Sequence, residues 1–250
     1  MENLNSWSLS KLDTLVLKGL AIIAMLFHHL YWDIPDWIEP YDGVLGWMGK
    51  LGKVCVAIFL FCSGYGLSVQ FAKVTGIKNS CKYMVKRFMS FYFNYWAVFI
   101  IFVPITVFLF HRSLSAAYGE DFSLIKSLGY DILGIQGFRS YNITWWFNKL
   151  LLILYLLFPI IYLGVRKYGF LTLLLSLFVC RFWMTFFRFD FYGDLYIFQL
   201  SFVLGVLWNK WAKLEESCCL RMTGRLGRWF KLMRRKPYIY VLVISAFLIL

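Results

Sequence analysis

The sequence predicts an all-α protein, a polytopic bundle of transmembrane helices, on three observations. The 250-residue chain is 61% hydrophobic and only 16% charged, whereas about half of the residues in soluble domains are apolar and about a quarter are charged. Apolar segments close to the ~20 residues needed to cross a bilayer recur along the chain. The basic residues behind the formal net charge of +13 gather between these segments, which is typical of membrane orientation and not of a solvated domain that binds nucleic acid.

Seven apolar segments are predicted to be helical, six as full spans and the last as a partial one. They cover residues 15–32, 50–71, 88–110, 146–164, 169–187, 192–211 and 238–250. The first is interrupted by histidines and lacks a small-residue cleavage site, so it is expected to be retained in the membrane. The last segment ends without a polar residue after it and is too short to cross a bilayer. We therefore expect residues 1–250 to form a single transmembrane domain whose C-terminal spans are missing.

The charges of the loops orient these spans. The loop after the second segment carries five basic residues and no acidic one: Lys73, Lys78, Lys82, Lys86 and Arg87. Residues 209–237 carry nine Lys or Arg against two Glu, and the loops between these basic ones, one of which contains Asp131, are acidic or mixed. Because basic loops stay in the cytosol, we expect a cytosolic N-terminus in a multi-pass protein of the cell's inner (cytoplasmic) membrane.

The first segment holds three ionisable residues, Lys18, His28 and His29. Such residues are costly in lipid and indicate a functional site. Lys18 and His29 are about three helical turns apart, so they share one face of the helix at about 16 Å along its axis, and His28 is turned about 100° away. A shielded neutral imidazole is suited to act as a general base near neutral pH. The alternative is a histidine that is hydrogen-bonded between helices.

Three further places carry candidate residues. Arg181 lies inside the fifth segment, where a charge is expensive, and it is expected to face the bundle interior. Ser63 and Gly64 have small side chains near one end of the second segment, which permits another helix to pack closely there. Two interpretations remain: a chemical role for these residues, or helix packing alone. Arg87 and Lys86 are expected either to bind an anionic ligand at the cytosolic face or to act as positive-inside anchors.

Metal and haem chemistry is not expected. The six cysteines have no zinc-ligand spacing. With three histidines in the chain, a bis-histidine haem would have to pair His111 with His28 or His29, or use a second chain. Trp146 opens the fourth segment and is expected to lie in the aromatic belt at the membrane surface.

The ordered series of motifs resembles the membrane acyltransferase 3 family over most of the chain. Residues 12–29 resemble the opening span of that family, and residues 56–66 resemble its phenylalanine-rich segment that ends in Ser-Gly-aromatic. Residues 83–88 are similar to its basic entry to the third span. Residues 145–159 and 198–205 resemble later spans.

The resemblance implies a donor such as acetyl-CoA and an acceptor among envelope or exported carbohydrates. The family's opening motif is a basic residue, ten intervening residues and a histidine, which Lys18 and His29 match. It follows that His29, not His28, would be the catalytic histidine. The sequence departs from the family in two places: Lys18 replaces an arginine and lacks its bidentate fork, and Ser90 stands where a second arginine follows Arg87.

The hypothesis from the sequence is an integral-membrane O-acyltransferase. His29 would be the general base that activates the acceptor hydroxyl, and Lys18, Arg87 and Lys86 would meet the phosphates of acetyl-CoA, which acts as a co-substrate. Membrane lipid and a carbohydrate or lipid-linked glycan are the expected partners. A hypothesis of another class is a transporter or flippase that uses Arg181 and the histidines along a polar pathway. A third is an inactive gene fragment.

Overall fold

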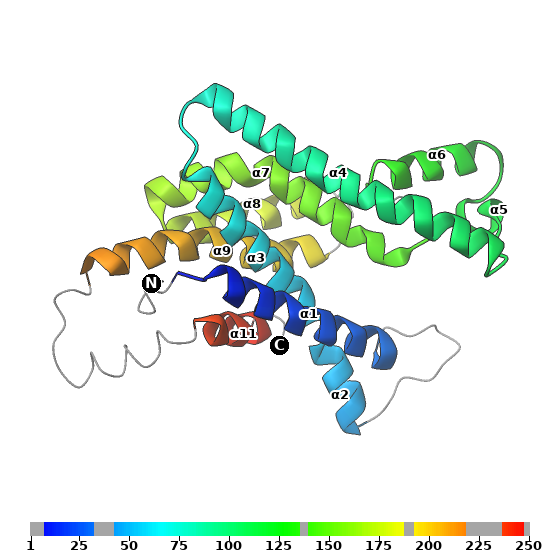
Figure 1. Ribbon diagram of the computed structural model, residues 1–250, viewed down its shortest axis with the longest axis horizontal. Helices are drawn as coiled ribbons and strands as arrows, with labels where there is room; N and C mark the ends of the chain where they lie inside the picture. Colours follow the sequence, from blue (N-terminus) through cyan, green and yellow to red (C-terminus); the bar gives the residue numbers. More distant parts are fainter. Residues whose placement is uncertain (1–7, 33–42, 136–139, 188–192, 219–236, 248–250) are drawn as a thin grey trace. The chain divides into compact units, whose positions relative to one another are not determined.

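The computed structural model describes residues 8–32, 43–135, 140–187, 193–218 and 237–247 (Figure 1). All regular structure in these ranges is helical, so the predicted all-α class is confirmed for them. The contacts divide the chain into two compact units, Met1–Ala72 with Phe158–Leu250, and Lys73–Leu157. The expectation of one transmembrane domain stays a prediction.

The first unit contains most of the helices and the second contains a long helix with three short elements. The first holds α1 (Lys11–Tyr31), α2 (Gly43–Leu51), α3 (Val54–Phe71), α8 (Leu171–Phe187), α9 (Gly193–Cys218), α11 (Tyr238–Phe247) and the second half of α7 (Trp146–Tyr168). The second holds α4 (Ile77–Phe108), α5 (Leu114–Tyr118), α6 (Asp121–Ile132), the 3-10 turn η1 (Ile143–Trp145) and the first half of α7.

Four helices within the described residues are long and apolar enough to cross a membrane: α1, α2 joined with α3 (Gly43–Phe71), α4 and α7. They correspond to the first four predicted segments. The later segments are helical as well, as α8, α9 and α11. The chain therefore has the character of a multi-pass membrane protein, while the count of six full spans and the cytosolic N-terminus stay predictions.

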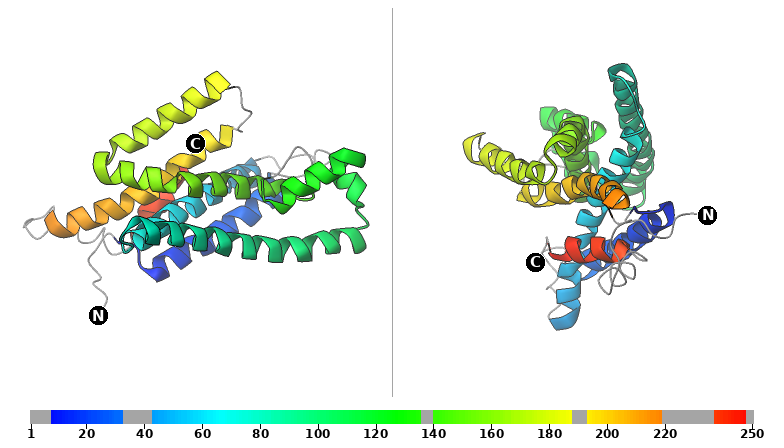
Figure 2. Two further views of the ribbon diagram at one scale, coloured as in Figure 1. Left: turned by 90° about the horizontal axis from the view of Figure 1, so that it is seen from above. Right: turned by 90° about the vertical axis from the view of Figure 1, so that its left-hand side faces the viewer.

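In the first unit, α3 lies between α1 and α9 (Figures 1 and 2). The backbones of α3 and α9 cross at two glycines. A Cβ atom built on Gly64 would overlap the carbonyl oxygen of Phe202, and one built on Gly205 would overlap that of Phe61. Glycine at both positions is therefore what allows the two backbones to approach. Around the crossing, the ring of Phe202 meets that of Phe158 edge-on at 6.3 Å.

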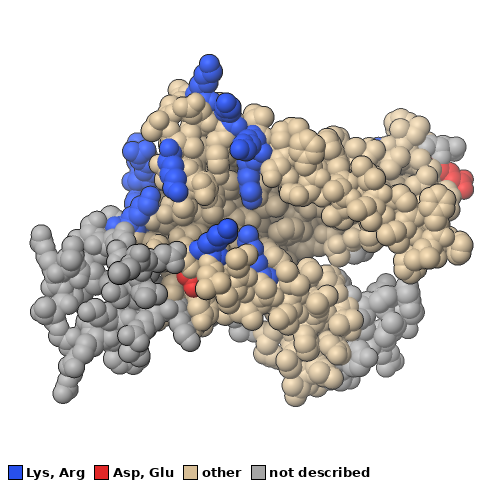
Figure 3. All heavy atoms as spheres, in the orientation of Figure 1, with Lys and Arg blue, Asp and Glu red and all other residues tan. Residues whose placement is uncertain are grey.

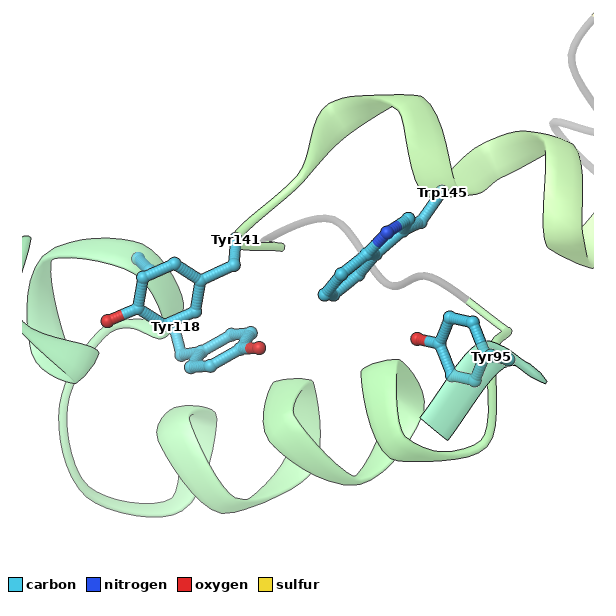
Figure 4. Close-up of a cluster of buried hydrophobic side chains, with 5 residues drawn as sticks. Tyr95, Tyr118, Tyr141 and Trp145 are labelled. Carbon is cyan, nitrogen blue, oxygen red and sulfur yellow. The ribbon is translucent and has the colours of Figure 1, made fainter. Parts of the chain in front are cut away.

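The second unit has an aromatic core of its own. Figure 4 shows Tyr95 of α4, Tyr118 of α5, Trp145 of η1 and Tyr141 from the chain just before η1 gathered together, all of them buried. The ring of Trp145 lies 5.6 Å from that of Tyr95 and 5.4 Å from that of Phe99. Burial of aromatic rings supplies much of the apolar stabilisation in such a core. This core fastens the start of α7 to the middle of α4.

Asp131, near the end of α6, is fully buried beside this core, although the sequence places it among the acids of an inter-span loop. Its Oδ2 accepts hydrogen bonds from the hydroxyls of Tyr118 (2.8 Å) and Ser140 (2.7 Å) and from the N–H of Tyr141 (3.3 Å). Burying a carboxyl is costly unless donors satisfy it. The three donors on Oδ2 offset part of that cost, while Oδ1 has no hydrogen-bond partner among the described residues. The carboxyl of Asp131 thus links Tyr118 of α5 to Ser140 and Tyr141, which follow α6, through hydrogen bonds.

Replacing Asp131 by leucine is expected to lower the free energy of unfolding by about 3–6 kcal/mol, because up to three buried donors lose their acceptor. Asp131→Asn is the matched control, since its amide oxygen still accepts hydrogen bonds; about 1 kcal/mol or less is expected for it. Thermal unfolding of the purified protein in detergent, followed by tryptophan fluorescence, measures both. An equal loss of stability in the two variants would show that the hydrogen bonds to Asp131 do not stabilise the fold.

Charged residues are unevenly distributed along α4. Figure 3 shows Lys and Arg side chains over the amino-terminal part of α4 and an uncharged surface over its remaining length. The charged part contains Lys78, Lys82, Lys86 and Arg87, all exposed. The uncharged part contains exposed Ile100, Ile101 and Phe108. The apolar part is the one suited to lipid.

Candidate functional site

The first helix is anchored at its start, where the candidate Lys18 is two turns away. Ser10 and Asp13 form a capping box, in which the side chain of each satisfies a backbone N–H of the other. The hydroxyl of Tyr65 on α3 accepts from the N–H of Leu9 (2.9 Å) and lies 3.2 Å from the carbonyl oxygen of Leu9. The tyrosine of the Ser-Gly-aromatic motif therefore positions the start of α1.

One stripe of α1 is packed against its neighbours. Leu17 and Ala21 on this stripe are buried. At about 100° per residue, His28 falls within about 20–40° of that stripe, while Lys18 and His29 fall about 80° or more to one side of it. The phase of the helix therefore gives the two adjacent histidines different surroundings.

His28 is held by α2. Its Nδ1 lies 2.9 Å from the carbonyl oxygen of Gly49. Because a carbonyl only accepts, Nδ1 carries the proton in this contact, which leaves Nε2 as the acceptor of a neutral ring. A Cβ atom on Gly52 would overlap the backbone of α1 at Ala24 and His28, so the end of α2 lies directly against this turn. The structure gives His28 a positioning role.

Lys18 and His29 are both exposed on the other face of α1. Eleven residues of helix separate them by about 16 Å along the axis and by about 20° around it. Lys18 also lies within electrostatic range of Cys62 on α3. The rings of His28 and His29 meet edge-on with centroids 5.4 Å apart. A cation and an imidazole thus lie on one face at opposite ends of the helix, as the spacing predicts.

Ser63 and Gly64 occupy neighbouring positions with different surroundings. Gly64 is buried at the crossing with α9, so the packing alternative accounts for it. Ser63 is half-buried. In the same motif, the ring of Tyr65 is buried, and its hydroxyl accepts the hydrogen bond from Leu9 just before α1. Sequence reasoning missed this tyrosine, and the only available signal was its place in a motif of small residues.

Arg87 belongs to the second unit, where it is paired with α7. Its guanidinium donates to the hydroxyl of Tyr155 (2.8 Å) and lies 5.2 Å from the centroid of that ring. Lys86 beside it is exposed. A stacked and hydrogen-bonded guanidinium is well oriented to bind phosphate with its remaining donors. Tyr155 was not singled out by the sequence as a partner of Arg87.

The remaining candidates are Trp146 and Arg181. Trp146 is half-buried at the start of α7, edge-on to Phe147 with centroids 6.3 Å apart. Arg181 is exposed on α8, whereas the sequence predicts that it faces the bundle interior. In the first unit, Lys18 and His29 lie on α1, and Ser63 and Gly64 lie on α3, which packs against α1. Lys86, Arg87 and Trp146 belong to the second unit.

Comparison with known protein families shows a match. The model of a family described as "Acyltransferase domain" matches residues 12–217, which is well over half of the chain. The matched range runs through both units and includes Lys18, His29 and Arg87. No curated protein and no solved structure shows a significant match to the chain.

Proposed function

Because the chain belongs to this acyltransferase family, we propose that it transfers an acetyl group from acetyl-CoA to a hydroxyl of an envelope or exported carbohydrate, with His29 as the general base. The family and the apolar helices make it a membrane acyltransferase. The donor, the acceptor, the role of His29 and the location in the inner membrane are the proposal.

The observation that carries the proposal is the difference between the two histidines. The Nδ1 of His28 is engaged with Gly49, beside the packed stripe of α1. His29 lies on the exposed face that also carries Lys18. A base must reach the proton that it removes, and this face is the accessible one.

The chemistry that follows is a proton-coupled acyl transfer. His29 removes the proton of the acceptor hydroxyl as its oxygen attacks the thioester carbonyl. The tetrahedral intermediate then collapses, the C–S bond breaks, and the imidazolium returns the proton to the leaving thiolate of CoA. The products are the O-acetyl ester and free CoA, so atoms and charge balance.

Cations on the helices support the use of a CoA donor. Lys18 stands about 16 Å along α1 from His29, which suits a donor whose phosphates and thioester lie at opposite ends of a long pantetheine arm. Arg87, oriented by Tyr155, and the exposed Lys86 are further candidates for the phosphates. With the N-terminus in the cytosol, Lys18 would lie on the side from which CoA enters.

Membranes that contain the chain, incubated with a glycan fraction and with acetyl-CoA radiolabelled in its acetyl group, test this function. Label is expected on a glycan or lipid-linked sugar as a base-labile ester, and at background level in membranes without the chain. Movement of a glycan across the membrane without label would favour the transporter hypothesis and contradict the proposal. Absence of both label and movement would also contradict it for this chain.

A further inference from the structure

The second half of α4 is apolar on all sides. Residues 97–110 contain no charged side chain, and Val98, Ile100, Ile101 and Ile105 are each at least 44% exposed. A helix that is hydrophobic all round lies in a core or in lipid. Since these side chains are exposed within the described residues, this half of α4 is the part that lies in the bilayer.

The short helix α6 lies on the other side of the same aromatic core. Leu124 and Leu128 of α6 pack against the core, and so do Phe99, Phe102 and Val107 of α4. α6 therefore occupies the same depth as the apolar half of α4. Figure 1 shows α6 running back from the far end of α4 toward its middle.

The C-terminal end of α6 is closed by side chains from one turn of α4. Tyr95 donates its hydroxyl hydrogen bond to the carbonyl of Asp131, and Trp96 donates from Nε1 to Ile132 (2.9 Å). The hydroxyl of Tyr92 donates to the carbonyl of Leu133 (3.2 Å). These carbonyls lie in the last turn of α6 or just beyond it, where partners within the helix are lacking; that of Asp131 also accepts from the N–H of Gly134 (2.9 Å). In water they could be solvated. Satisfying them with protein donors is what a non-helical chain requires at membrane depth.

The side of α6 that faces away from the core carries exposed apolar residues beside the exposed Lys126. Phe122 is 76% exposed and lies roughly opposite to Leu124 and Leu128 around the helix, while Ile125 is 68% exposed and lies about 60–100° to one side of them. Leu133, just beyond the helix, is 49% exposed. Lys126 lies over the ring of Tyr130 at 6.0 Å, a cation–aromatic pair that suits the headgroup region. A twelve-residue helix of this kind is too short to span.

We propose that α6 is a re-entrant membrane helix, whose outer face of Phe122, Ile125 and Leu133 contacts the acyl chains of membrane lipid. It enters beside the C-terminal end of α4 and descends to the level of Tyr95, and Tyr141, farther along the chain, donates to the carbonyl of Arg112 and so lies back at that end of α4. The described residues 121–135 are thereby a part of the membrane-embedded protein, and not of an aqueous loop. The proposal is independent of the reaction that the protein performs.

Nitroxide accessibility tests the proposal on the full chain in lipid vesicles. Single cysteines at positions 125 and 133, in a background with the native cysteines replaced, carry the spin label. Position 105 on α4 is the lipid reference and position 78 is the aqueous reference, both exposed. At 125 and 133, relaxation is expected to respond to oxygen at least threefold more than to a nickel chelate, as at 105, and the immersion depth is expected to be greater at 133.

Three results at these positions would overturn the proposal. Sensitivity to the nickel chelate equal to that at position 78 would place α6 in water. Low sensitivity to both reagents would place a protein partner, and not lipid, on this face. Equal depth at 125 and 133 would mean that α6 lies flat and does not descend. A background that keeps the far-UV spectrum of the parent chain shows that the cysteine replacements left the fold intact.

Discussion

Replacing His29 by alanine is expected to reduce acyl transfer by about 100- to 10,000-fold, the contribution typical of a positioned general base. Because His29 is exposed on α1, removing its ring leaves no buried cavity, and the fold is expected to persist. The loss should therefore fall on the rate of the chemical step. Single-turnover acetyl transfer from acetyl-CoA to glycan, in membranes with matched amounts of the chain, measures it.

The adjacent histidine supplies the matched control. In the variant His28→Asn, the new side chain can place an amide N–H close to the position of the imidazole Nδ1–H, so the contact with the Gly49 carbonyl is kept. Activity within about threefold of the parent is expected if His28 only positions α2, since a kept hydrogen bond leaves stability nearly unchanged. Parent-level activity of His29→Ala would refute its role. A deeper loss at position 28 than at position 29 would reverse the assignment of the base.

Replacing Gly64 by alanine is expected to produce the largest structural effect of a single methyl group. The added Cβ would meet the backbone carbonyl of Phe202, which belongs to a helix and cannot move like a flexible side chain. Overpacking of this kind costs about 1–3 kcal/mol or more, and it would force α3 and α9 apart. A lower thermal unfolding midpoint in detergent and a smaller monodisperse fraction on size exclusion are expected.

Gly66, two residues along the same helix, is the control for this effect. A Cβ atom there meets no other heavy atom within 4 Å among the described residues. Alanine at position 66 is therefore expected to leave stability unchanged or to raise it by about 0.5–1 kcal/mol, because alanine is favoured over glycine in a helix. Gly205→Ala, on the opposite side of the crossing, should lose stability as Gly64→Ala does. Equal behaviour of Gly64→Ala and Gly66→Ala would show that the crossing is not close-packed.

Local pattern was enough to predict the helices and the pairing of Lys18 with His29. The apolar segments became helices because uninterrupted apolar stretches have one way to satisfy their backbone in lipid. The eleven-residue spacing set the shared face of Lys18 and His29, since the helical period is fixed. The resemblance chose His29 over His28, and the family match confirms the family although not that role.

Pattern failed where the outcome depended on partners distant in sequence. Asp131 looked like a loop acid, and it is buried because Tyr118 and Ser140 come to it from either side in the chain. The helix α6 has mixed composition and little local signal, and its position depends on side chains of α4 that lie 36 to 41 residues away.

The sequence by itself determined that this chain belongs to an acyltransferase family, that its described residues form apolar helices, and that Lys18 and His29 share a helix face, because hydropathy, helical period and motif order are properties of local sequence. Tertiary structure alone decided which histidine is tied to α2, that Gly64 lets α3 and α9 meet, and that Tyr155 orients Arg87. Each of these depends on a contact between segments, and the free energy of such contacts is set by geometry that no local pattern encodes.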